Sequence, residues 1–218
     1  MKNSTRYFLL FLISATAISC GNNKSEKQKE QTVSTSKLNA PLAKQLEDIY
    51  EKDQAKRRDV DATLVKHGIN STQMDSLMRS IGKQDSVNII SVSAILDKYG
   101  WPGPDVVGET GSAALFIVVQ HADRKSQAKY LPLMRKAVKE HKALPGDLAK
   151  LEDRVALDQG QKQIYGTQFG WNAQKKAYYL YPIIDPTRVN ERRAEMNMGT
   201  IEDGMAHWKL KWNPNDYK

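Results

Sequence analysis

His121 is the residue of this chain whose type and surroundings are best suited to chemistry. It follows the apolar run 113–119 with only Gln120 between them, and Asp123 stands two positions further on. A positioned imidazole can accept or donate a proton near neutral pH, and a carboxylate can orient it. We expect Asp153 or Asp123 to be that carboxylate.

A second group of polar residues borders segments that we expect to be buried, and it comprises Arg154, Tyr165, Thr167 and Gln168. Buried polar groups need hydrogen-bond partners, so we predict that Arg154, Tyr165 and Gln168 cluster with Asp153 and the histidine, and Thr167 is a further candidate. In such a cluster the arginine and the tyrosine can stabilise a developing negative charge. The alternative is a structural role, in which the histidine is a core residue whose ring nitrogens are both satisfied by neighbours.

Other chemistries find little support in the sequence. The histidines at positions 67, 121, 141 and 207 are scattered and form no H-x-x-x-H pair, so no metal site and no cofactor are predicted. Cys20 is the only cysteine, which leaves the rest of the chain without a disulfide or a thiol nucleophile. The net charge of +8 is spread along the chain without a clustered basic stripe, so we expect no binding of nucleic acid.

Two long helices are expected to position some of the polar residues of the chain. Apolar residues recur at three- and four-residue spacing over 42–64 and again over 74–99, and Gly68 and Gly100 follow these stretches as end signals. Ser71 or Thr72 can cap the second helix. The link between the helices is short, which predicts an antiparallel helix hairpin.

Four polar residues interrupt the apolar stripes of these helices. Asp53 and Arg57 lie on the stripe of the first helix, and Asp85 and Asn88 lie on that of the second. Burying a charge without partners costs several kcal/mol, so we expect the first pair to face the second across the hairpin. Three interpretations stay open: a solvent-exposed stripe, a self-satisfied structural network, or the lining of a polar pocket.

The remaining pattern predicts a mainly α fold, a helical bundle built on the long antiparallel helix hairpin with one small β-hairpin near the C-terminus. The apolar run 113–119 indicates a buried helix. Further helices are expected over 125–142, where Pro132 marks a kink or a late start, and from Pro145 to Gly160. Aromatic and β-branched residues over 163–169 and 177–184 predict the β-hairpin. A short helix capped by Asp185 and a last helix near 201–210 complete the fold.

The first twenty residues have the pattern of a bacterial lipoprotein signal. Lys2 and Arg6 precede a mostly apolar run over 7–18, and small residues lead to Cys20. The run is shorter than the roughly 20 residues that a membrane span needs. We expect cleavage before Cys20 and its lipidation, with an ordinary secretory signal as the alternative. The protein would then be a membrane-anchored lipoprotein of the bacterial cell envelope, at the periplasmic or outer-membrane face.

The expected domain organisation follows from this signal. Residues 1–19 form the signal peptide, and residues 20–37 are polar and charged, which predicts a flexible tether. Residues 38–218 then form a single, mostly helical domain, since their number suffices for one sizeable core.

Together these segments resemble a bacterial family, the domain of unknown function 6624 (DUF6624). The resemblance covers residues 42–205 and rests on motifs that occur in this order: Asp53-Gln54 with Arg57, Asp85 with Asn88, Gly100-Trp101-Pro102-Gly103, Gln120-His121-Ala122-Asp123, Asp153-Arg154, Gln163 to Phe169, Asp185-Pro186 and Glu191-Arg192-Arg193. Two positions depart from the family pattern, which has an acidic residue at Asn190 and a glycine at Asn197. Asparagine tolerates the left-handed conformation that a helix cap needs, so we expect that cap to be kept.

The resemblance implies a fold and motif positions but no reaction, because the family has no assigned activity. Two classes of function stay open. One is a binding or interaction module whose polar pocket holds an unknown small molecule or envelope protein. The alternative is a hydrolase- or lyase-like enzyme that uses His121 as general acid or base. A deep cavity holding His121, Arg154 and Tyr165 would favour the enzyme, and direct bonds among the polar residues would favour a structural or binding role.

Overall fold

The computed structural model describes residues 38–172, 174–175 and 177–217. The expected signal peptide, Cys20 and the tether lie outside the described residues. The described chain is mainly α-helical with one small antiparallel two-stranded sheet near its C-terminus, which confirms the predicted fold class. Among the described helices, none combines the length and the apolar character that crossing a membrane requires.

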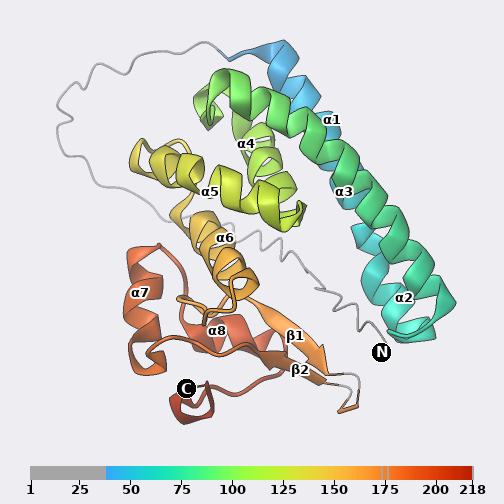
Figure 1. Ribbon diagram of the computed structural model, residues 1–218, viewed down its shortest axis with the longest axis vertical. Helices are drawn as coiled ribbons and strands as arrows, with labels where there is room; N and C mark the ends of the chain where they lie inside the picture. The colour runs from blue at the N-terminus through green and yellow to red at the C-terminus, as the bar shows by residue number, and fades with distance from the viewer. Residues whose placement is uncertain (1–37, 173, 176, 218) are drawn as a thin grey trace, which may run out of the picture.

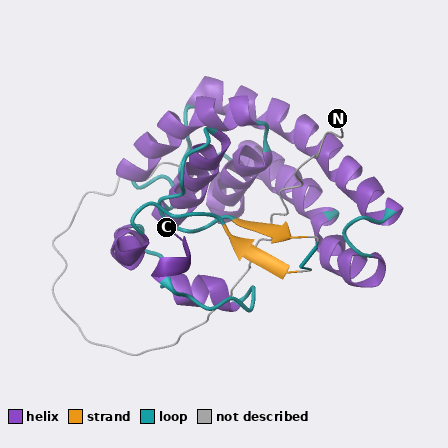
Figure 2. Ribbon diagram, turned by 60° about the horizontal axis from the view of Figure 1, so that its bottom comes forward, coloured by secondary structure: helices purple, strands orange, loops and turns teal. Residues whose placement is uncertain are grey.

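The elements follow one another in the order α1 (Ala40–Ala55), η1 (Arg57–Asp59), α2 (Val60–His67), α3 (Thr72–Tyr99), α4 (Pro104–His121), α5 (Arg124–Lys139), α6 (Pro145–Asp158), β1 (Phe169–Asn172), β2 (Ala177–Leu180), η2 (Pro186–Arg188), α7 (Val189–Glu195), α8 (Ile201–Ala206) and η3 (Pro214–Tyr217), where η marks a short 3-10 helix. Figure 1 shows α1 and α3 side by side, with α4 and α5 next to them and α6 leading to the C-terminal elements. In Figure 2 the helices arch over the two strands.

The predicted helix hairpin is present, with α1 and α2 antiparallel to α3 (Figure 1). Ser71 caps α3 by accepting a hydrogen bond from the N–H of Met74 at 3.1 Å. Gly68 ends α2 and Gly100 ends α3, both at positive φ (82° and 70°), a conformation that glycine adopts without strain.

The first helix is interrupted, so its prediction as one continuous helix to Gly68 is wrong. η1 separates α1 from α2. In a continuous helix the N–H of Arg57 would bond to the carbonyl of Asp53. Instead, Nη1 of the Arg57 side chain donates to that carbonyl at 2.9 Å. The interruption therefore coincides with the side chain that connects this helix to α3.

α4 lies at the centre of the largest core cluster, as its apolar run predicts. Leu115 and Val119 of α4 are fully buried there, together with Leu46 of α1 and Val92 of α3. α1 packs closely on α4 at Gly111, where an added Cβ would lie at an ordinary contact distance of 3.5 Å from the Cβ of Leu46 and would be crowded only by the Cβ of Val107, at 3.0 Å in the preceding turn. This packing brings the end of α1 beside the end of α4.

α5 and α6 follow the predicted boundaries closely. Asp123 caps α5 by accepting from the N–H of Ser126 at 3.0 Å, so the helix begins at Arg124. Pro132 therefore lies inside α5 and does not delay its start. α6 begins at Pro145, where the missing N–H of proline costs nothing.

The β-hairpin forms with a different first strand from the predicted one. Strand β1 covers only Phe169–Asn172 and pairs with β2, and the segment 163–168 is a loop. Two features exclude a strand there. Gly166 has φ of 71°, and the backbone N–H groups of the loop bind a carboxylate from α6. The second strand is also shorter than predicted and ends at Leu180.

The C-terminal helices are short. η2 and α7 together form the helix expected after Asp185, but its predicted capping is wrong, because the Asp185 side chain accepts from the hydroxyl of Thr187 at 2.7 Å and from no helical N–H. Asn197 adopts the left-handed conformation with φ of 54°, which confirms the expectation for that position. The last predicted helix ends at Ala206 rather than near 210.

Candidate functional site

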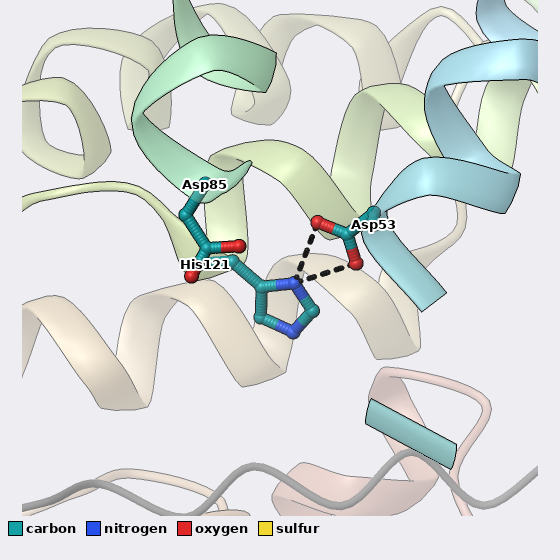
Figure 3. A group of neighbouring side chains, drawn as sticks. All are labelled: Asp53, Asp85 and His121. Atoms are coloured by element: carbon teal, nitrogen blue, oxygen red, sulfur yellow. Dashed lines mark hydrogen bonds and ion pairs between the residues drawn. The ribbon is translucent and has the colours of Figure 1, made fainter. Parts of the chain in front are cut away.

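His121 and Asp53 form the centre of the site. Nδ1 of His121, in the last turn of α4, lies 3.1 and 3.0 Å from the two carboxylate oxygens of Asp53 at the end of α1 (Figure 3). The two side chains are 1% and 0% exposed. We assign the imidazole proton to Nδ1, because the buried carboxylate can only accept. Nε2 is then a hydrogen-bond acceptor.

The predicted orienting carboxylates are wrong. Asp123 caps α5, and Asp153 binds backbone N–H groups of the loop 163–168, so neither orients the imidazole. Asp53 takes that role instead, because α1 packs along α4 and the two helices end beside each other. Sequence spacing could not show this, since the partners come from separate helices.

Nε2 of His121 is buried and has no hydrogen-bond partner among the described residues. Figure 3 shows that it points away from both carboxylates of the group. Burial lowers the pKa of His121 to about 4, although its hydrogen bond to Asp53 opposes that shift; the positive charges of Arg57 and Arg154 lower it further. The imidazole is therefore neutral at physiological pH and offers a lone pair at Nε2.

Arg57 joins Asp53 to α3. Its Nη2 donates to both carboxylate oxygens of Asp85 at 2.8 Å, and its Nη1 lies 3.4 Å from the Asp53 carboxylate. Asn88 also reaches Asp53, from Nδ2 to Oδ1 at 3.4 Å. These contacts confirm that Asp53 and Arg57 face Asp85 and Asn88 across the hairpin. The Arg57 and Asp85 side chains are 12% and 17% exposed, so the stripe is not a solvated face.

The two carboxylates differ in their electrostatics. Burial alone would raise the pKa of Asp53, but its hydrogen bond with His121, the charge of Arg57 and a hydrogen bond from Gln54 hold it below the ordinary value. Burial raises the pKa of Asp85 to about 6 and outweighs the attraction of Arg57. Asp53 is thus the stable anion of the site, and Asp85 titrates close to neutral pH.

Asp53, Asp85 and His121 are also the group that could hold a metal ion. One ligand atom from each lies within 4.8 Å of the others. Carboxylate and imidazole ligands suit divalent transition metals. However, the guanidinium of Arg57 already lies between the two carboxylates as their counter-charge, and Nδ1 already donates to Asp53. A metal ion would have to displace Arg57, so the geometry favours an arginine-centred network.

The second set of predicted residues forms a separate network. Asp153 of α6 accepts from the N–H groups of Tyr165 and Thr167 and from the Thr167 hydroxyl, each at 2.9 Å. Arg154 donates to Oε1 of Gln168 at 3.0 Å. This network fixes the loop 163–168 against α6.

Tyr165 points its hydroxyl elsewhere, to Glu152 at 3.0 Å. Burial and the charge of Glu152 raise the pKa of Tyr165, so the hydroxyl stays protonated and engaged. The prediction that Arg154 and Tyr165 act together on one charge therefore has no support in their contacts.

The predicted cluster thus divides into two networks. Asp153, Arg154, Tyr165, Thr167 and Gln168 come together, and among the described residues none of them bonds to the histidine, whose Nδ1 contacts Asp53 and whose Nε2 has no partner. The charge of Arg154 nevertheless contributes to the low pKa of His121, so the two networks are electrostatic neighbours.

Two glutamines belong to the networks, and a third, Gln120, stands apart from both. Gln120, predicted from its place beside the histidine, is 2% exposed, and neither of its amide atoms has a partner among the described residues. Gln84 donates to Asn88 at 2.8 Å, and Gln163 accepts from the N–H of Gln168 at 2.9 Å. The last two were missed as site residues. Gln84 lies four residues before Asn88, which is the one spacing signal that could have revealed it.

Two cavities of the protein, one at the first half of α4 and one at the end of α2, are lined by residues other than these. The polar side chains mostly bond to one another, which favours a structural or binding role over an open catalytic pocket. Nε2 of His121 and the amide of Gln120 are among the exceptions, and both are buried in the last turn of α4.

Comparison with known families agrees with the motifs that the chain carries. The family model of DUF6624, described as a family of unknown function, matches residues 40–209, and the chain therefore belongs to this family. No curated protein and no solved structure matches the chain.

Proposed function

We propose that this member of DUF6624 is a ligand-binding module of the bacterial cell envelope, in which Nε2 of His121 accepts a hydrogen bond from the ligand. One observation carries the proposal. Asp53 accepts a hydrogen bond from Nδ1, whereas the buried Nε2 has no partner among the described residues. A buried acceptor without a partner costs about 1–3 kcal/mol, and native proteins normally pair such groups. A ligand that offers an N–H or O–H group removes this cost.

The ligand is a small polar molecule, because the surroundings of the imidazole are tightly packed. The His121 side chain is 1% exposed, so the ligand reaches Nε2 through local opening or through a bridging water. The side-chain amide of Gln120, the preceding residue of α4, also lacks partners in the described structure, but consecutive residues of a helix point in different directions. The one requirement that Nε2 sets is therefore a donor group on the ligand.

The pKa of His121 favours binding over proton abstraction. A general base works best when its pKa is near the working pH. The value for His121 is about 4, so at neutral pH Nε2 accepts hydrogen bonds well but takes up a proton poorly.

Acid–base catalysis is the second candidate, and the Asp53–His121 pair is the observation that favours it. A carboxylate on Nδ1 with Nε2 unpartnered is the arrangement in which an imidazole removes a proton from a substrate. The enzyme would be hydrolase- or lyase-like, and it would need substrate binding to raise the pKa of the imidazole by bringing a negative charge close to it.

The location in the envelope is part of the proposal. Its support is the sequence of residues 1–20, in which a basic start, a short apolar run and small residues lead to Cys20. Lipidation of Cys20 with several acyl chains would give stable attachment to a membrane, whereas one chain would not.

The proposal is tested by the small molecules that the protein retains. The full chain is purified in detergent from envelopes of its host, and the compounds released on denaturation are identified by mass spectrometry. In His121→Asn the amide nitrogen can replace Nδ1 towards Asp53, but nothing replaces Nε2. We expect a compound that the wild type retains and that His121→Asn binds about tenfold more weakly, which corresponds to one lost hydrogen bond.

Two further variants sharpen the test. His121→Gln places an amide near the position of Nε2 and should restore part of the binding. His67→Gln changes an exposed histidine and should bind like the wild type. Equal retention by the wild type and His121→Asn, or retention of no compound by the wild type, would contradict the binding proposal. Chemical conversion of the retained compound by the wild type alone would establish the enzyme instead.

A further inference from the structure

A cavity of about 770 Å³ lies at the first half of α4, away from the network of His121. Its walls come from the turn before α4, from α4 itself, from α1 and α5, and from the connection between α5 and α6. The volume falls in the range of small-molecule sites in proteins. We propose that this cavity binds a neutral, hydroxylated small molecule of the size of a mono- or disaccharide.

The walls supply an apolar surface. Trp101, Phe116 and Met134 belong to the main core and also line the cavity, and Tyr50 of α1 adds a half-buried ring. The cavity therefore has a floor anchored in the core. Such a surface suits the apolar C–H face of a sugar ring, while the hydroxyl groups of the sugar need polar partners at the rim.

The rim supplies those partners. The side chains of Glu109, Thr110, Ser112 and His141 line the cavity, and none of them makes a hydrogen bond to another part of the described chain. Hydroxyl and imidazole groups can donate and accept, and the carboxylate accepts. A hydroxylated ligand satisfies this mixture, because each of its hydroxyl groups is both donor and acceptor.

The charges of the cavity favour a neutral ligand. Lys142 pairs with Glu140 at 2.8 Å, and Asp147 pairs with Lys150 at 2.9 Å, so both of these lining charges are compensated. The carboxylate of Glu109 is exposed to solvent and would repel an anion. No cluster of like charges is left among the described lining residues that would select a charged ligand.

The backbone at His141 ends α5 and places the side chain at this rim. His141 adopts the left-handed conformation with φ of 58°, where glycine is the usual residue, and the N–H of Lys142 bonds to the carbonyl of Ala137 at 2.8 Å. Asn197 and Lys209 end their helices in the same conformation. The side chain of His141 is exposed and makes no hydrogen bond within the described chain, so its imidazole is available to a ligand.

The test uses four neutral sugars as probes: glucose, N-acetylglucosamine, maltose and N,N′-diacetylchitobiose. The full chain in detergent is titrated with each at millimolar concentrations, and binding is followed by saturation-transfer NMR and by tryptophan fluorescence. Benzylamine and benzoate serve as a cationic and an anionic aromatic probe. We expect at least one of the four sugars to bind more tightly than either charged probe.

Matched variants locate the site. His141→Gly removes the imidazole at a position that glycine tolerates, and it should weaken sugar binding by about threefold to tenfold. Lys209→Gly makes the same change at another left-handed residue, with φ of 57°, outside the cavity lining, and should bind like the wild type. Ala113→Phe fills the cavity and should abolish binding. His121→Asn should leave it unchanged, which separates this site from the function proposed above.

Three results would overturn the proposal: no binding of any of the four sugars, tighter binding of benzylamine or benzoate, or sugar binding that His141→Gly and Ala113→Phe leave unchanged.

Discussion

Nδ1 of His121 lies 3.0 Å from Oδ2 of Asp53, although 68 positions separate the two residues in the chain. The contact exists because α1 packs along α4 and the two helices end side by side. The contact holds the Nδ1 edge of the imidazole and leaves Nε2, on the opposite edge, without a partner in the described structure. The charge of Asp53 is in turn balanced by Arg57, which also forms an ion pair with Asp85 on α3.

Loss of Arg57 should strongly destabilise the protein. Arg57→Met removes the counter-charge of two carboxylates that are 0% and 17% exposed. Breaking a buried ion pair by removing one partner costs about 3–5 kcal/mol. The free energy of unfolding, measured by urea denaturation, should fall by about that amount.

The neighbouring arginine is the matched control for this change. Arg58 is 61% exposed and pairs with Glu51 on the surface, so Arg58→Met should cost no more than about 0.5 kcal/mol. Adding Asp85→Asn to Arg57→Met should recover part of the loss, because one uncompensated carboxylate disappears. Equal costs for Arg57→Met and Arg58→Met would show that the network is not buried in solution.

Stability should depend on pH through two opposing groups. The pKa of His121 is about 4 in the folded protein against 6.5 ordinarily, so its contribution is complete above pH 6.5 and is lost as the pH falls towards 4. The pKa of Asp85 is about 6 against 3.8, so its contribution is complete below pH 3.8 and is lost as the pH rises towards 6. The two effects oppose each other between pH 4 and pH 6.

Removing Asp85 should therefore expose the effect of His121. Between pH 7 and pH 4, Asp85→Asn should lose up to about 3 kcal/mol more stability than the double variant Asp85→Asn with His121→Asn. Both proteins contain the same other titrating groups, so the difference reports on the imidazole together with the Asp53 carboxylate that it bonds. Parallel pH profiles for the two would mean that His121 is not buried in its neutral form.

Gly166→Ala should disrupt the loop that Asp153 holds. Gly166 has φ of 71°, and a Cβ there would lie 2.7 Å from Cδ1 of Ile201 and 2.8 Å from Cδ1 of Ile183. Strain and overpacking together should cost about 2–4 kcal/mol. Gly160→Ala is the control, because Gly160 has a similar φ of 75° with no atom within 4 Å of the added Cβ, and it should cost only about 1–2 kcal/mol. A smaller loss for Gly166→Ala than for Gly160→Ala, measured by thermal unfolding, would refute the packing argument.

Cys20→Ser should release the protein from membranes or block its maturation. The serine cannot form the thioether that lipidation requires, and the anchor is then lost. Fractionation of cells followed by immunoblotting measures this directly. A wild-type protein found entirely in the aqueous fraction would contradict lipidation.

Periodicity predicted the helices well because their apolar faces are continuous over several turns. α3, α5 and α6 begin and end close to their predicted residues, whereas α4 begins at Pro104, well before the apolar run 113–119 from which it was predicted. The wrong predictions have local causes, which the spacing of apolar residues does not reveal. At the point where the first helix would continue, the side chain of Arg57 donates a hydrogen bond to the carbonyl of Asp53. Where the first strand was expected, the carboxylate of Asp153 accepts hydrogen bonds from the backbone.

The candidate site was predictable where it depends on the face of a single helix. Asp53, Arg57, Asp85 and Asn88 interrupt apolar stripes, and a buried charge must find a partner in the facing stripe. The partner of His121 was not predictable, because it depends on how α1 and α4 pack. Several carboxylates bordered apolar segments, and no spacing in the sequence singled out Asp53 among them.

The protonation of the His121 ring tests the central claim most directly. Nitrogen NMR of the full chain labelled with ¹⁵N-histidine distinguishes a protonated from an unprotonated ring nitrogen. At pH 7 we predict that Nδ1 of His121 is protonated and that Nε2 is unprotonated, and that both signals stay unchanged down to about pH 5. Absence of both signals from His121→Asn assigns them. A protonated Nε2 at pH 7, as the other neutral tautomer or as the imidazolium, would contradict the claim that His121 presents an acceptor to a ligand.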